Sequence, residues 1–304
     1  MNRDTVLITG GSGLIGSNLV IRLAEKGYNI RVLSRTKLAV GGAELFLWDV
    51  DSGFIEEGAL NGVDHIVHLA GTNIGEGRWS SGRKKSIIDS RVKSARILLK
   101  VIADKELNIK SFISSSAIGY YGAISSDHIY TEEDRPGTDF NAQVCIEWEK
   151  AAAKFHDMGV RTTIIRTGIV LATGGGMLKA LMPAVKARFL PLFGNGNQYI
   201  PWIHIDDICR IYIKAIEEPG FGPVINGVAP EHVSYRLLIK TISSVLDRKL
   251  FSPPIPSVFW KLIVGEKAVI LVNGSRISSR LLEKSGYSFK YPELIPALRN
   301  LLIP

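Results

Sequence analysis

One stretch near the start of the chain decides the fold: VLITGGSGLIGSNLV, residues 6–20. A β-branched apolar run ends at Thr9, and an amphipathic helical pattern begins at Leu14. Three glycines recur every third residue across this junction: Gly10, Gly13 and Gly16. They suit a tight turn, a close approach of the backbone to a phosphate group, and close packing of helix on strand. The stretch therefore predicts a strand–turn–helix whose free N–H groups bind phosphates; the alternative is an ordinary glycine-rich turn.

The first two-thirds of the chain alternates short β-branched runs with longer helical patterns. This alternation predicts an α/β fold, a Rossmann-type doubly wound parallel sheet with helices on both faces. The expected strands are residues 5–9, 29–33, 44–48, 65–69, 111–115 and 162–166. The expected helices are residues 14–26, which Gly27 ends, 81–105 and 141–157.

The pattern changes after Gly168, where glycine-rich and proline-rich turns interrupt the alternation. The run PPIP at residues 253–256 predicts a turn at the start of a small helical segment. We therefore expect a nucleotide-binding Rossmann domain and a smaller, interleaved C-terminal substrate lobe. The expected division is residues 1–168 with 204–228 for the Rossmann domain, and 169–203 with 229–304 for the lobe.

Composition excludes several classes of protein. The 304 residues are 46% apolar and 22% charged, and the formal net charge is +8. No run of Lys or Arg exceeds three residues, which argues against a nucleic-acid partner and fits an anionic small molecule. Cys145 and Cys209 form neither a CxxC pair nor a zinc-binding spacing, so we expect a reduced, cytoplasmic protein without a metal. Charged residues interrupt the apolar run 258–272 and no leader precedes the first strand, so we expect neither a membrane partner nor a signal peptide.

The end of the second expected strand indicates which dinucleotide binds. An NAD site usually carries Asp or Glu there to bind the ribose hydroxyls. This chain has Ser34 and Arg35 instead, and an arginine can bind a 2′-phosphate through charge-assisted hydrogen bonds. The sequence therefore favours NADP(H) over NAD; the alternative is a solvated surface arginine.

Further strings occur in an order that resembles the extended short-chain dehydrogenase/reductases, a superfamily that includes the nucleotide-sugar epimerases. They are HLAG (68–71), RW (78–79), DSRV (89–92), SSAIGYYG (115–122), WE (148–149), RTG (166–168), WIHIDD (202–207) and LLEKSGYSF (281–289). With the glycine turn they resemble the atypical epimerase-family branch, whose members end in a small domain of unknown function. Dimers through the long helices are common in the superfamily, so a homodimer is an open alternative.

The resemblance implies cofactor contacts for three groups of residues. The pyrophosphate would lie on Gly10, Ser12, Gly13, Leu14, Ile15 and Gly16. The adenosine half would lie against Ser34, Arg35 and Asp49. The nicotinamide half would pass Leu69, Ala70, Gly71, Thr167, Gly168 and Ile169. Arg91 would lie near the cofactor phosphates or the mouth of the substrate site.

The catalytic residues of the superfamily are only partly present. The resemblance implies a Ser that binds the substrate oxygen, a Tyr that exchanges the proton and a Lys that lowers the pKa of that Tyr. Ser116 stands at the position of the serine, but Asn141 and Cys145 stand where Tyr-x-x-x-Lys would be, and we expect Cys145 to be a buried apolar residue. Tyr120 and Tyr121 are candidate substitute proton donors; the alternative is that both pack the loop.

Three residues are candidates for contact with the substrate: Trp79, Gln198 and His204. Trp79 lies in a glycine-rich loop that suits a lid over the nicotinamide. Gln198 ends a loop similar to the substrate-side loop of sugar-nucleotide enzymes, and a plain polar turn is the alternative. His204 ends an expected strand, where a structural role is the alternative to substrate contact.

These features favour an NADP-dependent oxidoreductase that transfers hydride to or from a small polar, sugar-like or nucleotide-linked substrate. In this hypothesis Ser116 binds the substrate oxygen, and Tyr120 or Tyr121 supplies the proton. The missing Tyr and Lys leave open a second hypothesis, a non-catalytic NADP(H)-binding redox sensor. A true nucleotide-sugar epimerase is the third hypothesis and has the least support, because it requires acid–base groups on both sides of the sugar.

Overall fold

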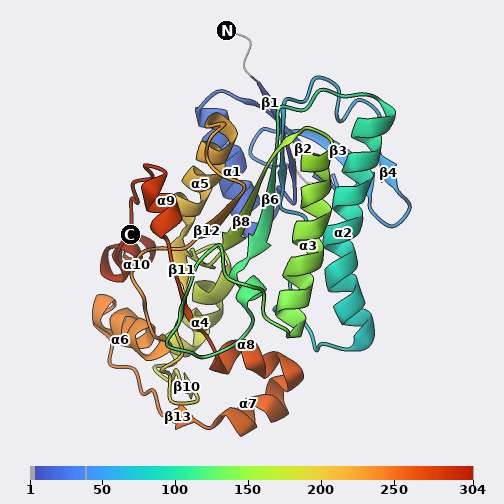
Figure 1. Ribbon diagram of the computed structural model, residues 1–304. Coiled ribbons are helices and arrows are strands. Elements are labelled where there is room, and N and C mark those ends of the chain that lie inside the picture. The colour runs from blue at the N-terminus through green and yellow to red at the C-terminus, as the bar shows by residue number, and fades with distance from the viewer. Residues whose placement is uncertain (1–3, 38–39, 304) are drawn as a thin grey trace.

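A large twisted sheet forms the centre of the computed structural model, which describes residues 4–37 and 40–303. Its strand order is β12-β8-β6-β5-β1-β2-β3-β4, and neighbouring strands run parallel except β3 and β4 (Figure 1). The order confirms the predicted doubly wound, Rossmann-type α/β fold. The bounds are β1 (Thr5–Thr9), β2 (Asn29–Ser34), β3 (Glu44–Asp49), β4 (Phe54–Ile55), β5 (His65–His68), β6 (Ser111–Ala117), β8 (Arg161–Thr167) and β12 (Val224–Gly227).

Helices cover both faces of this sheet (Figure 1). The first face carries α1 (Leu14–Glu25) and α5 (Ile205–Glu217), and the second carries α2 (Ser81–Asp104) and α3 (Phe140–Asp157). Val6 and Ile8 belong to the core on the side of α1, whereas Leu7 between them belongs to the core on the side of α2. Because both faces of the central strands are buried, their sequences are continuous apolar runs.

Local signals set the ends of the helices. The Ser80 Oγ accepts the backbone N–H of Arg83 at 3.2 Å and caps α2. Gly27 follows α1 with a φ of 78°, a left-handed conformation that suits the predicted glycine stop. At the other end of α1 the N-cap residue is Gly13, and no side chain of a described residue caps the first turn. The N–H groups there remain available to a ligand.

The chain leaves the sheet after β8 and later returns to it. Outside the main sheet, β9 (Ile169–Leu171) pairs with β11 (Trp202–His204). The chain then forms α5, which packs beside α1, and β12, which pairs with β8. Residues 204–228 thus contribute a helix and a strand to the Rossmann layers.

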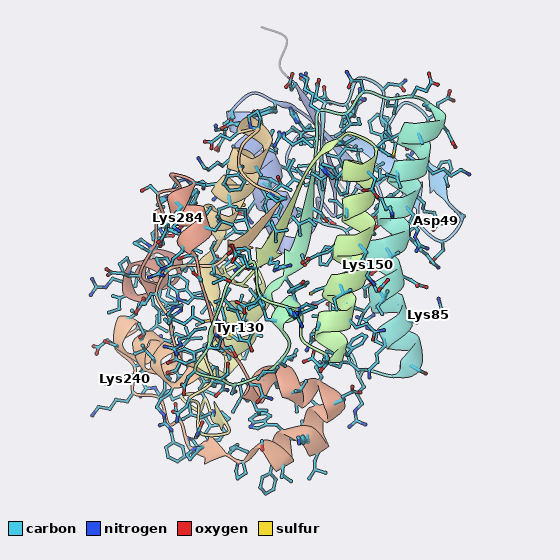
Figure 2. The ribbon with its side chains drawn as sticks, viewed as in Figure 1. Asp49, Lys85, Tyr130, Lys150, Lys240 and Lys284 are labelled. Carbon is cyan, nitrogen blue, oxygen red and sulfur yellow. The ribbon has the colours of Figure 1, made fainter. Side chains whose placement is uncertain are left out.

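A second core lies beyond the carboxyl ends of the strands, at the lower left of Figure 1. It contains Trp202, Leu238 and Leu298, and it is enclosed by α4 (Gly176–Lys186), α6 (Tyr235–Val245) and α10 (Leu294–Leu302). The remaining elements of this region are β10 (Leu192–Phe193), β13 (Pro254–Ile255), α7 (Ser257–Val264), η2 (Gly265–Ala268), α8 (Val269–Val272), β14 (Arg276–Ile277) and α9 (Arg280–Lys284). The pair β14 and β7 (Ile129–Tyr130) joins this region to the Rossmann half, and Figure 2 shows Tyr130 at that junction.

Candidate functional site

The glycine turn between β1 and α1 is the best-defined feature of the candidate site. Gly10 has a φ of 70°, and a Cβ there would lie 2.9 Å from the carbonyl of Leu69. A Cβ on Gly16 would lie 2.3 Å from the Gly10 oxygen. Both positions therefore require glycine. The turn presents the uncapped N-terminus of α1, where the helix dipole favours an anionic group.

Thr9 fastens this turn to the end of the neighbouring strand β5. Its Oγ1 accepts the backbone N–H groups of Leu69 and Ala70, both at 3.1 Å. The expected cofactor residues Leu69, Ala70 and Gly71 consequently lie beside the glycine turn, at the carboxyl edge of the sheet. Ligands of open α/β sheets bind in this kind of crevice, outside the carboxyl ends of the strands.

The ends of β2 and β3 carry the residues expected to meet the adenosine half. The Ser34 Oγ accepts the N–H of Thr36 at 3.3 Å, and the exposed Arg35 forms no ion pair with any residue that the structure describes. Asp49 ends β3 at the sheet edge (Figure 2), where hydrogen bonds from Ser52 and from the N–H of Asp51 hold its pKa below the usual value. Both charged side chains are exposed, at the ends of the two strands that lie beyond β1 in the sheet order.

A buried polar network connects Ser116 to the two tyrosines. The Ser116 Oγ donates to Glu149 Oε1 at 2.6 Å. The Glu149 carboxylate also accepts two hydrogen bonds from Arg166, from Nε and from Nη2, each at 2.9 Å. Bidentate pairing of this kind fixes both side chains and satisfies the charge that each buries.

The structure separates the two tyrosines that the sequence could not distinguish. The Tyr121 hydroxyl donates to Asn226 Oδ1 at 2.7 Å and accepts from Arg166 Nη1 at 3.0 Å. Tyr121 is only 2% exposed, and burial raises its pKa to about 12. Tyr120 is half-buried, and its ring centre lies 3.4 Å from the Arg166 guanidinium carbon. Tyr120 is thus the tyrosine that keeps access to a ligand.

The two positions on α3 where the sequence lacks the expected Tyr and Lys are closely packed. The turn η1 (Ile118–Tyr121) lies directly against the positions that this pair would occupy on α3. A Cβ on Gly119 would lie 3.3 Å from the Asn141 Cβ and 3.6 Å from the Cys145 Sγ. Asn141 and Cys145 are both buried beneath it, and burial raises the pKa of the Cys145 thiol to about 12. Cys145 is therefore the buried residue that the sequence predicted.

Arg91 lies under the loop that follows β5. Its Nη1 donates to the carbonyls of Thr72 and Ile87, at 3.0 and 2.8 Å, and its guanidinium lies 4.7 Å from the Trp148 ring. A Cβ on Gly71 would lie 2.9 Å from the Arg91 Cζ. Arg91 is buried, with an Nε that has no partner among the described residues, and burial lowers its pKa to about 10.

The segment after β8 lies at the same carboxyl edge of the sheet. A Cβ on Gly168 would lie 2.8 Å from the Pro201 carbonyl oxygen, so glycine lets the backbone after β8 pass close to the backbone of Pro201. Thr167 is buried at the end of the strand, and Ile169 is half-buried at the start of β9. These three residues lie at the carboxyl edge, as do Ser116 and the glycine turn.

The three residues expected to contact substrate are instead held by protein groups. Trp79 Nε1 donates to the Ile74 carbonyl at 3.0 Å. Gln198 Nε2 donates to the carbonyls of Phe193 and Leu271, at 3.1 and 2.7 Å. His204 is 1% exposed and caps α5 by accepting the N–H of Asp206 on Nδ1 at 3.0 Å, while Asn300 contacts its other nitrogen. This geometry favours the structural alternative for His204 and for Gln198.

Sequence patterns did not assign roles to several members of the network. Glu149 and Arg166 stood within the strings quoted above, but α3 carries several other charged residues and β8 also carries Arg161, so charge alone does not single out the pair. No sequence pattern singled out Asn226 or Glu132. The Asn226 N–H donates to Glu132 Oε1 at 2.8 Å across segments far apart in the chain.

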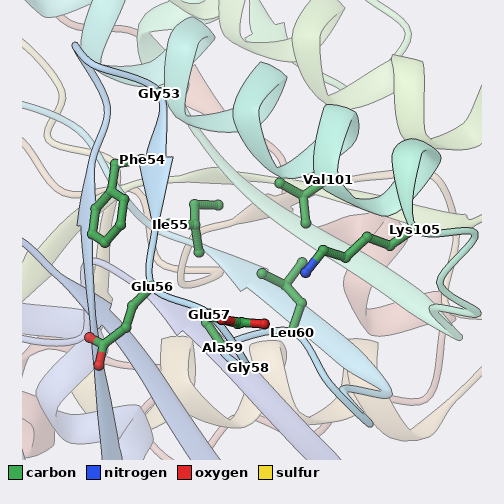
Figure 3. Close-up of a pocket in the computed structure, with 10 residues that line it drawn as sticks. All are labelled: Gly53, Phe54, Ile55, Glu56, Glu57, Gly58, Ala59, Leu60, Val101 and Lys105. Carbon is green, nitrogen blue, oxygen red and sulfur yellow. The ribbon is translucent and has the colours of Figure 1, made fainter.

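A cavity of about 220 Å³ lies between β4 and the C-terminal end of α2, lined in part by Phe54, Leu60 and Lys105 (Figure 3). α2 runs antiparallel to the strands, so Lys105 lies at the sheet edge opposite the glycine turn, and this cavity is separate from the candidate site. Within residues 4–37 and 40–303, no group of His, Cys, Asp or Glu side chains is arranged to hold a metal ion.

Fold and sequence comparisons define the class of protein. The sequence profile of the NAD dependent epimerase/dehydratase family matches residues 6–227, and a domain of unknown function, DUF1731, matches residues 255–301. The chain belongs to the NAD dependent epimerase/dehydratase family and has its Rossmann-type NAD(P)-binding fold. The predicted resemblance, including the small domain at the end of the chain, is confirmed.

The chain is similar to several proteins, two of them over nearly their full length. An epimerase family protein of Mycobacterium bovis is 34% identical over 98% of this chain and 97% of its own. The crystal structure of the human epimerase family protein SDR39U1 with NADPH has a TM-score of 0.87 at 29% identity, covering 98% of both chains. A nucleoside-diphosphate sugar epimerase structure from Corynebacterium glutamicum has a TM-score of 0.78 at 31% identity, covering 99% of this chain and 58% of that one.

Proposed function

We propose that this protein is an NADP-dependent oxidoreductase acting on a small polar substrate in the reducing environment of the cytoplasm. The observation that carries the proposal is the rigid frame of Glu149 and Arg166, which holds Ser116 and the half-buried Tyr120 at the carboxyl edge. Supporting it are the uncapped glycine turn beside this frame and the presence of NADPH in the human relative's structure. Two buried free cysteines fit a reducing compartment.

The residues present fit a dinucleotide. The turn of Gly10, Ser12, Gly13, Leu14, Ile15 and Gly16 would bind the pyrophosphate. Arg35, with no competing carboxylate among the described residues, would bind the ribose 2′-phosphate, next to Ser34 and Asp49. Leu69, Ala70, Gly71, Thr167, Gly168 and Ile169 would line the path of the nicotinamide, and Arg91 would support Gly71 from below. When bound, the cofactor supplies or accepts a hydride.

The protein groups then manage the substrate oxygen. Glu149 holds the Ser116 Oγ in place, and Ser116 would bind the carbonyl or alcohol oxygen. The Tyr120 hydroxyl would donate a proton to that oxygen on reduction and take it back on oxidation. Arg166, clamped by Glu149, fixes the ring of Tyr120 from one side. Tyr121 would hold Arg166 instead of exchanging protons, because its hydroxyl is buried between two partners.

One observation favours a second candidate, an NADP(H)-binding sensor without catalysis. Asn141 and Cys145 lie buried beneath Gly119, so no lysine ammonium can assist a proton donor from that helix. Such a protein would bind NADPH but would oxidise it with no metabolite.

Calorimetric titration with NADPH and NADH tests the cofactor assignment. We expect wild type to prefer NADPH, and Arg35→Ala to bind NADPH about tenfold or more weakly, because a charge-assisted hydrogen bond contributes about 1.5–3 kcal/mol. Arg96→Ala is the matched control: it changes an exposed arginine that lies on α2, and this variant should bind NADPH as wild type does. Equal affinity for both nucleotides would make Arg35 an ordinary surface residue. A screen of carbonyl compounds and sugars for NADPH oxidation then separates the enzyme from the sensor.

A further inference from the structure

The outer side of α7 is unusually apolar for a surface helix. Val258, Phe259, Leu262 and Ile263 are between 55% and 71% exposed, and their spacing places them on one side of the helix. On the inner side, the Trp260 ring packs edge-on against Phe193, with ring centres 4.5 Å apart. The helix is thus anchored from within and presents its apolar residues to solvent.

The apolar surface extends beyond the helix. Phe189 and Phe251 are 46% and 67% exposed, and their ring centres lie 6.0 Å apart. The Phe251 N–H donates to the Arg188 carbonyl at 2.9 Å, and the chain runs from Phe251 through β13 directly into α7. We call the six side chains the apolar face: Phe189, Phe251, Val258, Phe259, Leu262 and Ile263. Exposed clusters of large apolar residues mark interaction surfaces.

The charges within the segments that build this face have one sign. The two segments that build it, residues 172–205 and 248–265, contain no Asp or Glu. They carry exposed cations at Lys186, Arg188, Arg248, Lys249 and Lys261, and none of these forms an ion pair with a described residue. Some exposed lysines of the Rossmann half, among them Lys85 and Lys150 (Figure 2), do pair with carboxylates, Lys85 with Asp89 and Lys150 with Glu147. Of the flanking carboxylates, Glu266 already binds Lys84 at 2.7 Å.

We propose that the apolar face docks onto an anionic lipid surface. An amphipathic helix with cations at its border binds such a surface by burying apolar side chains among the lipids and placing its charges near the headgroups. A second copy of this chain is the weaker candidate, because a symmetric interface would bring these unpaired cations together. The eight-residue α7 is far too short to cross a bilayer, and none of the helices in the described part of the chain could do so.

α7 is fixed to the rim of the candidate site. The Lys267 Nζ donates to the carbonyls of Gly75 and Gly77, at 2.6 and 3.0 Å, and the Arg78 Nη2 donates to the Ile263 carbonyl at 3.5 Å. These bonds tie the segment after α7 to the loop that follows β5. Docking would therefore bring the candidate site close to the membrane. The proposal departs from the expectation, drawn from the sequence, that the protein has no membrane partner.

Co-sedimentation of the full-length protein with lipid vesicles tests the proposal. We expect binding to vesicles of equal parts phosphatidylcholine and phosphatidylglycerol, little binding to phosphatidylcholine alone, and weaker binding as salt is raised. The double variant Phe259→Asp/Leu262→Asp should bind about tenfold or more weakly. Ile295→Asp changes a residue of α10 that is 51% exposed and lies away from α7 (Figure 1); this control should bind as wild type does.

Urea unfolding of both variants tests whether misfolding causes a loss of binding. We expect both variants to remain folded, because all replaced side chains are on the surface. Absence of binding to the anionic vesicles, equal binding to both kinds of vesicle, or wild-type binding by the double variant would each overturn the proposal. Light scattering distinguishes a lipid surface from a second copy of the chain as the partner of the apolar face. A dimer that the double variant converts to a monomer, without lipid binding by wild type, would assign the face to a second copy instead.

Discussion

The Glu149 carboxylate clamps the Arg166 guanidinium with two hydrogen bonds of 2.9 Å, so that helix α3 and strand β8 are joined at the carboxyl edge of the sheet. Both side chains are nearly inaccessible, with 11% and 4% of their surfaces exposed. The remaining donors and acceptors of the pair bind Ser116, Tyr121 and the Glu132 carbonyl. The pair therefore organises every side chain that the proposed chemistry requires.

Removal of one partner of this clamp should strongly destabilise the protein. We expect Glu149→Ala to lower the free energy of unfolding by about 3–5 kcal/mol, because it leaves the Arg166 charge buried and uncompensated. Glu147→Ala is the control, since it removes an exposed ion pair with Lys150 on the same helix and should change stability by about 0.5 kcal/mol or less. Urea unfolding of both variants measures the difference. Equal effects would mean that the buried clamp contributes no more than a surface pair.

The two tyrosines should respond differently to the loss of a hydroxyl. Tyr120→Phe keeps the ring on Arg166, so we expect near wild-type stability and a fall in turnover of about a hundredfold or more. Tyr121→Phe leaves Asn226 and Arg166 without a buried partner and should cost about 1–3 kcal/mol of stability, with a smaller effect on turnover. NADPH oxidation with a substrate from the screen, together with unfolding curves, checks both. The reverse pattern would make Tyr121 the proton donor.

The third glycine of the turn should tolerate no side chain. Gly16→Ala would place a Cβ 2.3 Å from the Gly10 oxygen, a backbone atom that cannot move without opening the turn. We expect a loss of about 3 kcal/mol or more of stability and no measurable NADPH binding. Gly82→Ala on α2 is the control, because a Cβ there meets open space, and it should be neutral or stabilising by up to about 1 kcal/mol. Wild-type nucleotide affinity in Gly16→Ala would contradict the proposed role of the turn.

Buried neutral histidines should make the protein sensitive to mild acid. Burial lowers the pKa of His68 from 6.5 to about 3, and it lowers the pKa values of His65 and His204 as well. Below about pH 6.5 these histidines are therefore protonated in the unfolded chain but stay neutral in the folded chain. The free energy of unfolding consequently falls as the pH drops through that range. Each such histidine contributes a slope of up to about 1.4 kcal/mol per pH unit.

A His68→Gln variant tests this assignment. His68 contacts Ser94 Oγ at 2.8 Å, and glutamine keeps a polar group there without a titrating ring. We expect a smaller loss of stability between about pH 7.5 and about pH 5 than in wild type, measured by urea unfolding at each pH. An unchanged pH dependence would show that His68 is not a source of the sensitivity. His156, which is exposed, provides the matched control in His156→Gln.

Features of the fold that depend on local sequence patterns could be predicted from the sequence. The central strands and the helices α1, α2 and α3 lie within a few residues of their expected bounds, because apolar periodicity and caps act locally. The glycine spacing at Gly10 and Gly16 reflects a steric demand of the turn itself. The family strings located the carboxyl ends of β6 and β8, where Ser116 and Arg166 meet.

Tertiary structure alone decided how those residues are used. The difference between Tyr120 and Tyr121 depends on Arg166, which lies far along the chain from both. His204 proved to be a helix cap packed against Tyr291, with ring centres 3.9 Å apart. The exposure of one side of α7, within the apolar run at 258–272, became visible only in the folded chain. By itself the sequence determined the alternation of strands and helices and the glycine turn, since these follow from local geometry. Burial, hydrogen-bond partners and exposed surfaces depend on contacts between distant segments, which only the packed chain defines.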